Sequence, residues 1–299
     1  TESVLLMAEL LDAPGRLITI DVGHHHIHEY EIHRISFKDG DRLGAIRGHY
    51  NRITLITQQH LQQLTVDSLV INRQGIDGGW GWRQNETSDL HLTSYAVLAL
   101  IQARQAGFSV SEYYLPSALD YMAANQPPPG PTQAGWELDR QAFMAYVRAL
   151  AGGGDLVLAQ DLFAERARLS AAGQALLAMA LDIFNPSSQE AATLFSDLQS
   201  TALRSGSGAS WEDANRGYQN MSTSLSTTAI VTYALVRHAP ESTLLPDALR
   251  YLMLNRQADG GWSSSYTTAW SLLALDAWAQ ATGEFQASFS YGATLNSAS

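Results

Sequence analysis

The sequence predicts a mainly α-helical protein: an α/α toroid of helical hairpins, with a short N-terminal β segment and a C-terminal strand. Three observations support this fold class. A phrase is repeated, since residues 72–80 read NRQGIDGGW and residues 255–262 read NRQADGGW. Helices that are apolar on nearly every side alternate with amphipathic ones, as inner and outer layers require. Clusters of glycine and proline fall between the predicted helices.

Each copy of the phrase is interpreted as a joint between hairpins. Glycine adopts positive φ without steric cost, so Asp-Gly-Gly can end a helix, and the following Trp buries a large flat surface. Weaker joints are expected at Trp136, which follows a Gly, and at Trp211, which follows a Ser. A second repeat, residues 115–122 and 245–252, indicates two half-arrays of hairpins. The predicted joint residues are Asp77, Gly78, Gly79, Trp80, Trp136, Trp211, Asp259, Gly260, Gly261 and Trp262.

Three segments follow one another along the chain. Residues 1–50 are predicted to be β-rich, because residues 17–22 and 27–37 alternate or contain runs of β-branched side chains. Residues 51–284 are predicted to form the α/α toroid. Residues 285–299 return to a strand pattern.

The helices of the toroid are predicted from their apolar patterns. Inner helices, apolar on most sides or rich in small residues, are expected at residues 92–105, 141–150, 171–184, 227–236 and 266–281. Amphipathic outer helices are expected at residues 115–125, 156–168 and 244–255. Residues 53–72 are predicted to be helical up to the first joint. Residues 205–208, which read SGSG, are interpreted as a flexible linker.

Composition argues against several function classes. The net charge of −11, without clustered Lys and Arg, argues against a nucleic-acid surface. The absence of cysteine removes disulfides, thiolate metal sites and a cysteine nucleophile. No run approaches the roughly 20 apolar residues that span a bilayer. Because the chain begins Thr1-Glu2-Ser3, without an initiator Met or a signal peptide, we expect a fragment of a longer protein, and we expect no cofactor.

Four motifs together resemble the thioester-domain region of bacterial alpha-2-macroglobulins, a family related to complement proteins. They are the Asp-Gly-Gly-Trp joints and residues 88–95 (SDLHLTSY), 266–275 (YTTAWSLLAL) and 281–285 (ATGEF). The resemblance covers about residues 53–299, and it implies that residues 285–299 begin a following β-domain. It implies an α/α toroid inside a secreted or periplasmic protease trap, in contact with neighbouring macroglobulin domains and with a protease. It implies a protease-inhibitor domain rather than an enzyme.

The chain departs from the family at the reactive group. Thioester-bearing members carry a Cys-Gly-Glu-Gln-type motif in the first helical segment, where Cys and Gln form the bond that captures a protease. This chain has no cysteine, so covalent trapping is excluded for it. Two explanations are open. Some family members lack the thioester and act without covalent capture; alternatively, residues 1–50 are a divergent segment that replaces the motif-bearing helix.

A histidine-rich run at residues 24–33 is the candidate for metal binding. On a strand, His24, His26 and His28 would share one face, and alternate imidazoles can converge on zinc or copper. A surface histidine run also binds metals adventitiously, and no supporting residue is identifiable. We therefore predict no metal site and keep these three residues as weak candidates.

Acidic residues after the Trp residues provide an alternative function. If the joints gather at one end of the toroid, carboxylates and aromatic side chains would line a common rim, as a glycosidase or polysaccharide lyase requires. The competing interpretation, which we prefer, is that these carboxylates cap helix starts and interact with helix dipoles. The residues are Glu86, Asp89, Glu137, Asp139, Glu212 and Asp213.

Overall fold

The computed structural model describes residues 11–12, 16–17, 74–82, 86–215, 218–258 and 260–283 of the 299-residue chain. The described part is mainly helical, which confirms the predicted fold class. The α-helices are α3 (Leu90–Gln105), α4 (Tyr114–Asn125), α5 (Gly135–Leu150), α6 (Leu156–Ala164), α7 (Ala171–Phe184), α8 (Gln189–Ser200), α9 (Ser224–His238), α10 (Leu245–Leu254) and α11 (Ser265–Thr282).

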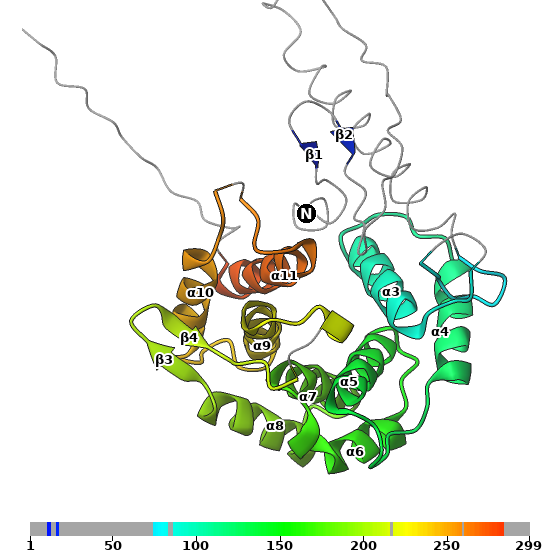
Figure 1. The fold of residues 1–299 in the computed structure, drawn as a ribbon, viewed down its shortest axis with the longest axis horizontal. Coiled ribbons are helices and arrows are strands. Elements are labelled where there is room, and N and C mark those ends of the chain that lie inside the picture. Colours follow the sequence, from blue (N-terminus) through cyan, green and yellow to red (C-terminus); the bar gives the residue numbers. More distant parts are fainter. Residues whose placement is uncertain are drawn as a thin grey trace, which may run out of the picture.

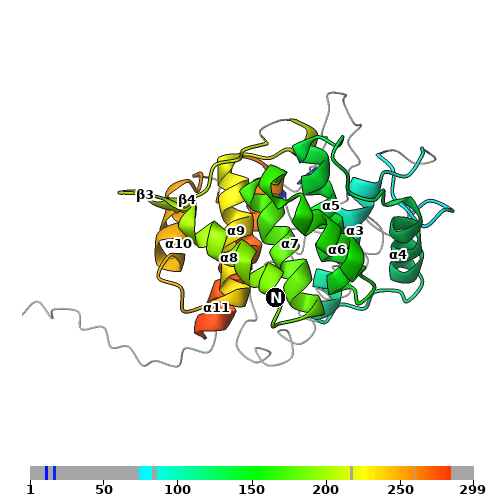
Figure 2. The ribbon, with the colours of Figure 1, turned by 90° about the horizontal axis from the view of Figure 1, so that it is seen from below.

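The helices form two layers along a curved array (Figure 1). Helices α3, α5, α7, α9 and α11 make the inner layer, and α4, α6, α8 and α10 lie outside them. Neighbouring inner helices pack directly, as α5 does with α7, α7 with α9 and α9 with α11. Seen at right angles, the helices stand side by side (Figure 2). The two layers follow the apolar pattern of the sequence, and closure into a full ring stays a prediction.

Helix α9 shows how an inner helix is covered on all sides. Every residue from 226 to 236 is buried, because α7 and α11 flank this helix and α10 also packs against it. Two of its buried threonines have hydroxyls that bond to the helix's own carbonyls, whereas Thr227 Oγ1 has no hydrogen-bond partner among the described residues. Thr228 Oγ1 donates to the Ser224 carbonyl and Thr232 Oγ1 donates to the Thr228 carbonyl, each at 2.7 Å. The sequence can therefore place threonine in the core without leaving these hydroxyls unsatisfied.

Helix α8 is absent from the elements that the sequence predicted. The N-cap of this helix is Ser188, whose hydroxyl accepts from the Ala191 amide at 3.1 Å. Its buried residues Ala191, Leu194, Phe195 and Leu198 have the spacing of one helix face. The apolar pattern spans only about two turns, so it is weaker than the patterns of the inner helices.

Residues 205–208 form a hairpin turn, so their interpretation as a flexible linker is wrong. Strand β3 (Leu203–Ser205) pairs antiparallel with β4 (Gly208–Ser210), and Ser205 lies opposite Gly208. Gly208 has φ of 122°, and a Cβ at this position would collide with the carbonyl of Asp247 in α10. Glycine therefore allows β4 to pack closely against α10.

Two helix boundaries also differ from the predicted ones. Helix α5 begins at Gly135, well before residues 141–150, because Glu137 Oε2 accepts from the Ala134 amide at 2.7 Å and starts the helix earlier. Helix α6 ends at Ala164, and the end of the segment predicted at residues 156–168 is the short 3-10 helix Arg166–Arg168.

Near the N-terminus two short strands are described, β1 (Leu11–Asp12) and β2 (Arg16–Leu17), and they pair antiparallel. The other strand residues predicted within residues 1–50 lie outside the described residues, as do the predicted helix at residues 53–72 and the strand at residues 285–299. The predicted division into three segments therefore stays a prediction.

Three Trp residues are tied to the following inner helix by the same kind of hydrogen bond, from the Trp backbone amide to a threonine hydroxyl. We call this arrangement the Trp–Thr joint. Each bond is buried, so it satisfies an amide that would be costly to leave without a partner. The bonds, at 2.9, 3.1 and 2.9 Å, join Trp80 to Thr93 in α3, Trp211 to Thr228 in α9, and Trp262 to Thr268 in α11.

The indole of two of these residues also reaches back to the preceding outer helix. Trp211 Nε1 donates to the Leu198 carbonyl in α8 at 2.7 Å, and Trp262 Nε1 donates to the Leu252 carbonyl in α10 at 2.8 Å. Both carbonyls lie in the last turn of their helix, where carbonyls lack the regular donor four residues further along. In each case the Trp side chain caps the preceding outer helix, and the Trp backbone amide is hydrogen-bonded to the following inner helix.

Glycine shapes the loop before the first joint. Gly78 has φ of 87°, and a Cβ at this position would collide with the carbonyl of Ser117 in α4. Asp77 Oδ1 accepts from the Gly79 amide at 3.1 Å and so closes the turn. The turn can therefore lie directly against α4.

The turn in the second copy of the repeated phrase has a similar backbone conformation. Gly260 has φ of 91°, and the Gly261 carbonyl accepts from the Gln257 amide at 2.8 Å. Asp259 lies outside the described residues.

Trp136 differs from the other three Trp residues. It lies inside α5 rather than ahead of an inner helix, and the Arg140 guanidinium is 5.0 Å from the centre of its ring. The Trp136 carbonyl accepts from Asn220 Nδ2 at 2.9 Å. This placement corrects the expectation that Trp136 forms a joint like the others, because here the helix has already begun.

Replacing Thr228 with valine removes the acceptor of the Trp211 amide while preserving the shape of the side chain. Because a buried amide without a partner costs about 1–3 kcal/mol, we expect Thr228→Val to lower the free energy of unfolding by that amount in a urea titration. Thr232→Val is the matched control, since Thr232 is equally buried in α9 and donates to a carbonyl of the same helix. Equal losses in the two variants would contradict a special role for the joint.

Candidate functional site

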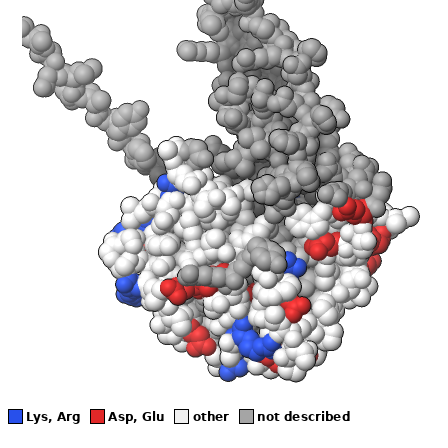
Figure 3. Space-filling model, in the orientation of Figure 1, with Lys and Arg blue, Asp and Glu red and all other residues white. Residues whose placement is uncertain are grey.

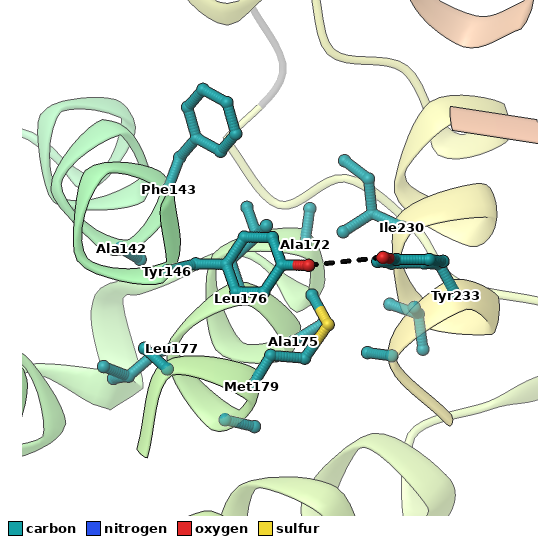
Figure 4. Packing of buried hydrophobic residues seen from close by; sticks show 14 of the residues in the cluster. Ala142, Phe143, Tyr146, Ala172, Ala175, Leu176, Leu177, Met179, Ile230 and Tyr233 are labelled. Carbon is teal, nitrogen blue, oxygen red and sulfur yellow. Dashed lines mark hydrogen bonds between the residues drawn. The ribbon is translucent and has the colours of Figure 1, made fainter. Parts of the chain in front are cut away.

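Aromatic side chains from four inner helices meet at the centre of the array. The hydroxyls of Tyr146 in α5 and Tyr233 in α9 share a hydrogen bond of 3.3 Å (Figure 4). Tyr233 also meets Trp270 of α11 edge-on, with 6.0 Å between ring centroids. Tyr95 of α3 and Tyr266 of α11 are likewise 6.0 Å apart. We call these five residues the aromatic centre, and it links α3 to α11 across the two ends of the described array.

Burial keeps three tyrosines of this centre, Tyr95, Tyr146 and Tyr266, protonated. It raises the pKa of Tyr266 to about 12 and holds the pKa of Tyr95 and Tyr146 well above the ordinary tyrosine range. At neutral pH their hydroxyls are therefore neutral hydrogen-bonding groups rather than nucleophiles or general bases.

Asp139 is a buried carboxylate in the first turns of α5. Its Oδ1 accepts from the Ser170 amide at 2.9 Å, and its Oδ2 accepts from Asn215 Nδ2 at 2.7 Å. A Cβ at Gly173 would collide with Oδ1, so glycine makes this contact possible. Burial raises the pKa of Asp139 to about 6, although both hydrogen bonds oppose the rise. This group therefore favours folding most below pH 4, and that contribution is lost as the pH rises through about 6.

His91, in the first turn of α3, is also buried, with 8% of its surface exposed. Among the described residues, neither of its ring nitrogens has a hydrogen-bond partner. The ring meets Tyr95 edge-on at 4.9 Å and Phe143 at 5.8 Å. Burial, with a smaller contribution from the charge of Arg140, lowers the pKa of His91 to about 3. The ring is therefore neutral at pH 7 and acts as a packed aromatic side chain.

The acidic residues near the Trp residues largely serve local structure. Asp89 caps α3 by accepting from the Leu92 amide at 2.7 Å, and Glu137 caps α5. Asp139 and Asp213 are buried, with 8% and 3% of their surface exposed. A catalytic pair must reach a substrate, so these contacts favour helix capping over a carbohydrate-active rim.

The described residues contain neither a metal-binding cluster nor a membrane-spanning helix. In the part of the chain that the structure describes, no group of three or more His, Asp or Glu side chains could hold a metal ion. The weak candidates His24, His26 and His28 lie outside that part, and their role stays a prediction. None of the described helices is both long and apolar enough to cross a membrane.

The threonines of the joints were not among the joint residues predicted from the sequence. Thr93, Thr228 and Thr268 follow their Trp partners by 13, 17 and 6 positions, so no fixed spacing marks them. The available signal was a Thr within the first turns of each inner helix that follows a buried Trp. Such a Thr can satisfy a loop amide without leaving the helix.

A two-layered helical array with Trp–Thr joints and an aromatic centre defines the class of fold. No protein-family model and no curated protein matches the sequence. Solved structures do match, and bacterial alpha-2-macroglobulins are among them.

Three of these structures illustrate the match. A C-terminal portion of native alpha-2-macroglobulin from Escherichia coli has a TM-score of 0.58 and 17% identity, covering 74% of this chain and 35% of that one. The E. coli protein activated by porcine elastase has a TM-score of 0.58 and 18% identity, covering 73% and 19%. Salmonella alpha-2-macroglobulin reacted with methylamine has a TM-score of 0.57 and 17% identity, covering 73% and 14%. The chain has the fold of one part of these proteins and matches little more than a third of their length at most.

Replacing His91 with phenylalanine removes a titrating ring and retains a planar side chain beside Tyr95. Unfolded histidine titrates near 6.5 and folded His91 near 3, so acidification favours the unfolded wild-type chain. Between pH 7 and pH 4.5 we expect the wild type to lose about 2–3 kcal/mol more unfolding free energy than His91→Phe, measured by urea titration at both pH values. The same pH dependence in both proteins would show that His91 is not a buried neutral ring.

Proposed function

We propose that this chain is a macroglobulin-type helical domain without a thioester, and that it contributes to protease inhibition by non-covalent contact. The observation that carries the proposal is the likeness to the C-terminal portion of bacterial alpha-2-macroglobulins in a chain without cysteine. Because a thioester requires a cysteine sulfur, this chain cannot form one. The proposed location, from the resemblance alone, is the periplasm or the cell envelope.

The outer surface supports a role in packing against other protein domains. Leu254 and Met253, in the last turn of α10, are 63% and 45% exposed, and Leu203 on β3 is 49% exposed. On the face seen in Figure 3, charged side chains are scattered and much of the surface is uncharged. We propose that these exposed apolar side chains take part in contacts with other protein domains. We propose that the partners are neighbouring domains of the parent protein and a protease.

The test uses the intact parent protein, with elastase as the protease. If the parent acts as a non-covalent trap, cleavage of casein should slow several-fold, because a large substrate is kept away from the caged protease. Cleavage of a small chromogenic peptide should persist, since that peptide can still reach the active site. Electrophoresis under denaturing conditions should release unmodified elastase.

Methylamine, which attacks thioesters, provides the control. Treatment of the parent with methylamine should leave casein protection unchanged, because this chain has no reactive ester. Unimpaired casein cleavage would contradict protease inhibition. A covalent adduct with elastase, or loss of protection after methylamine treatment, would contradict the non-covalent mechanism.

A further inference from the structure

A cleft of about 410 Å³ lies at the C-terminal ends of three inner helices, whereas the Trp–Thr joints lie at helix starts. The last turns of α7, α9 and α11 line this cleft, together with Phe195 of α8. Its volume is within the range of small-molecule sites, which is about 300–1,000 Å³.

Part of the cleft lining is apolar, and we call this part the apolar floor. Met179 and Ile183 of α7 face the cleft together with Ala234 of α9 and Ala277 of α11. Ile183 is 40% exposed, so part of this apolar surface is in contact with water in the free chain. An apolar ligand side chain placed here would remove that surface from water.

One wall of the cleft carries a fixed polar pair. The His238 ring stacks on Phe195, with 3.7 Å between centroids and 7° between ring planes. His238 Nδ1 lies 3.4 Å from Asp182 Oδ1. The side chains of Asp182 and His238 are 32% and 30% exposed, so a ligand in the cleft can reach both.

The cleft carries both signs of charge. Asp182 supplies a carboxylate, and the partial negative charge of three helix C-termini adds to its attraction for a cation. Arg237 supplies a guanidinium, whose carbon lies 5.5 Å from the centre of the Tyr233 ring. Arg237 would repel a purely cationic ligand, and Asp182 and the helix C-termini would repel a purely anionic one. A ligand that carries both charges is complementary to the whole lining.

We infer that this cleft binds a short zwitterionic peptide with apolar side chains, whose ammonium group pairs with Asp182 and whose carboxylate pairs with Arg237. The apolar floor receives a side chain of the peptide. Hydrogen bonds to charged groups contribute more than neutral ones, so each charged end adds to affinity and to selectivity. This site is independent of the proposed protease contact.

The test titrates leucyl-leucine into the full chain by calorimetry. Two blocked peptides serve as matched ligands: N-acetyl-leucyl-leucine lacks the ammonium group, and leucyl-leucinamide lacks the carboxylate. We expect leucyl-leucine to bind, and each blocked form to bind about 10-fold more weakly or worse, because one charge-assisted contact is lost. No binding of leucyl-leucine at millimolar concentration, or equal binding of all three peptides, would overturn the inference.

Variants assign each charge to its residue. Asp182→Asn should bind N-acetyl-leucyl-leucine as tightly as leucyl-leucine, because the partner of the ammonium group is gone. Arg237→Gln should likewise bind leucyl-leucinamide as tightly as leucyl-leucine. Arg250→Gln is the control, because Arg250 pairs with Asp247 in α10 and lies outside the cleft. Peptide selectivity that is unchanged in both cleft variants would place the ligand elsewhere. The comparison of blocked peptides on the unmodified chain remains decisive even if one variant fails to fold.

Discussion

The hydrogen bond from a buried Trp amide to a threonine hydroxyl is the contact on which the layered arrangement depends. Helices that pack only through apolar side chains can slide or rotate with small changes in energy. A loop whose amide is fixed to one helix, and whose indole is fixed to another, cannot slide without leaving a buried donor unsatisfied. That penalty is larger than the net gain from an ordinary hydrogen bond, so the joint specifies register more than it adds stability.

The aromatic centre complements the joints by filling the space that the inner helices enclose. His91 and Asp139, both buried near the starts of inner helices, respond to pH in opposite directions. Between about pH 4 and pH 6, acidification relieves the desolvation of the Asp139 carboxylate and penalises the neutral His91 ring. The two effects therefore partly cancel in the whole protein and become visible only when one of the two groups is replaced.

Some features of this fold could be predicted from the sequence, and others could not. Inner helices were predictable because a helix that is apolar on all sides must be covered on all sides. The bend at Gly78 was predictable because Asp-Gly-Gly favours positive φ. Helix α8 could not be predicted, because an apolar face of two turns is a weak signal. The partner of Trp211 could not be predicted either, because the joint threonines lie at no fixed distance from their Trp. The turn at Gly208 could not be predicted, because its close contact with α10 depends on tertiary packing.

None of the contacts that hold this array together involves cysteine, because the chain has none. Native-state hydrogen exchange of Trp211 tests the central claim most directly. If the Trp–Thr joint couples the layers, the backbone amide and the indole N–H of Trp211 should exchange only on global unfolding, as slowly as the amides of α9. Exchange at the rate of an exposed loop would contradict the account.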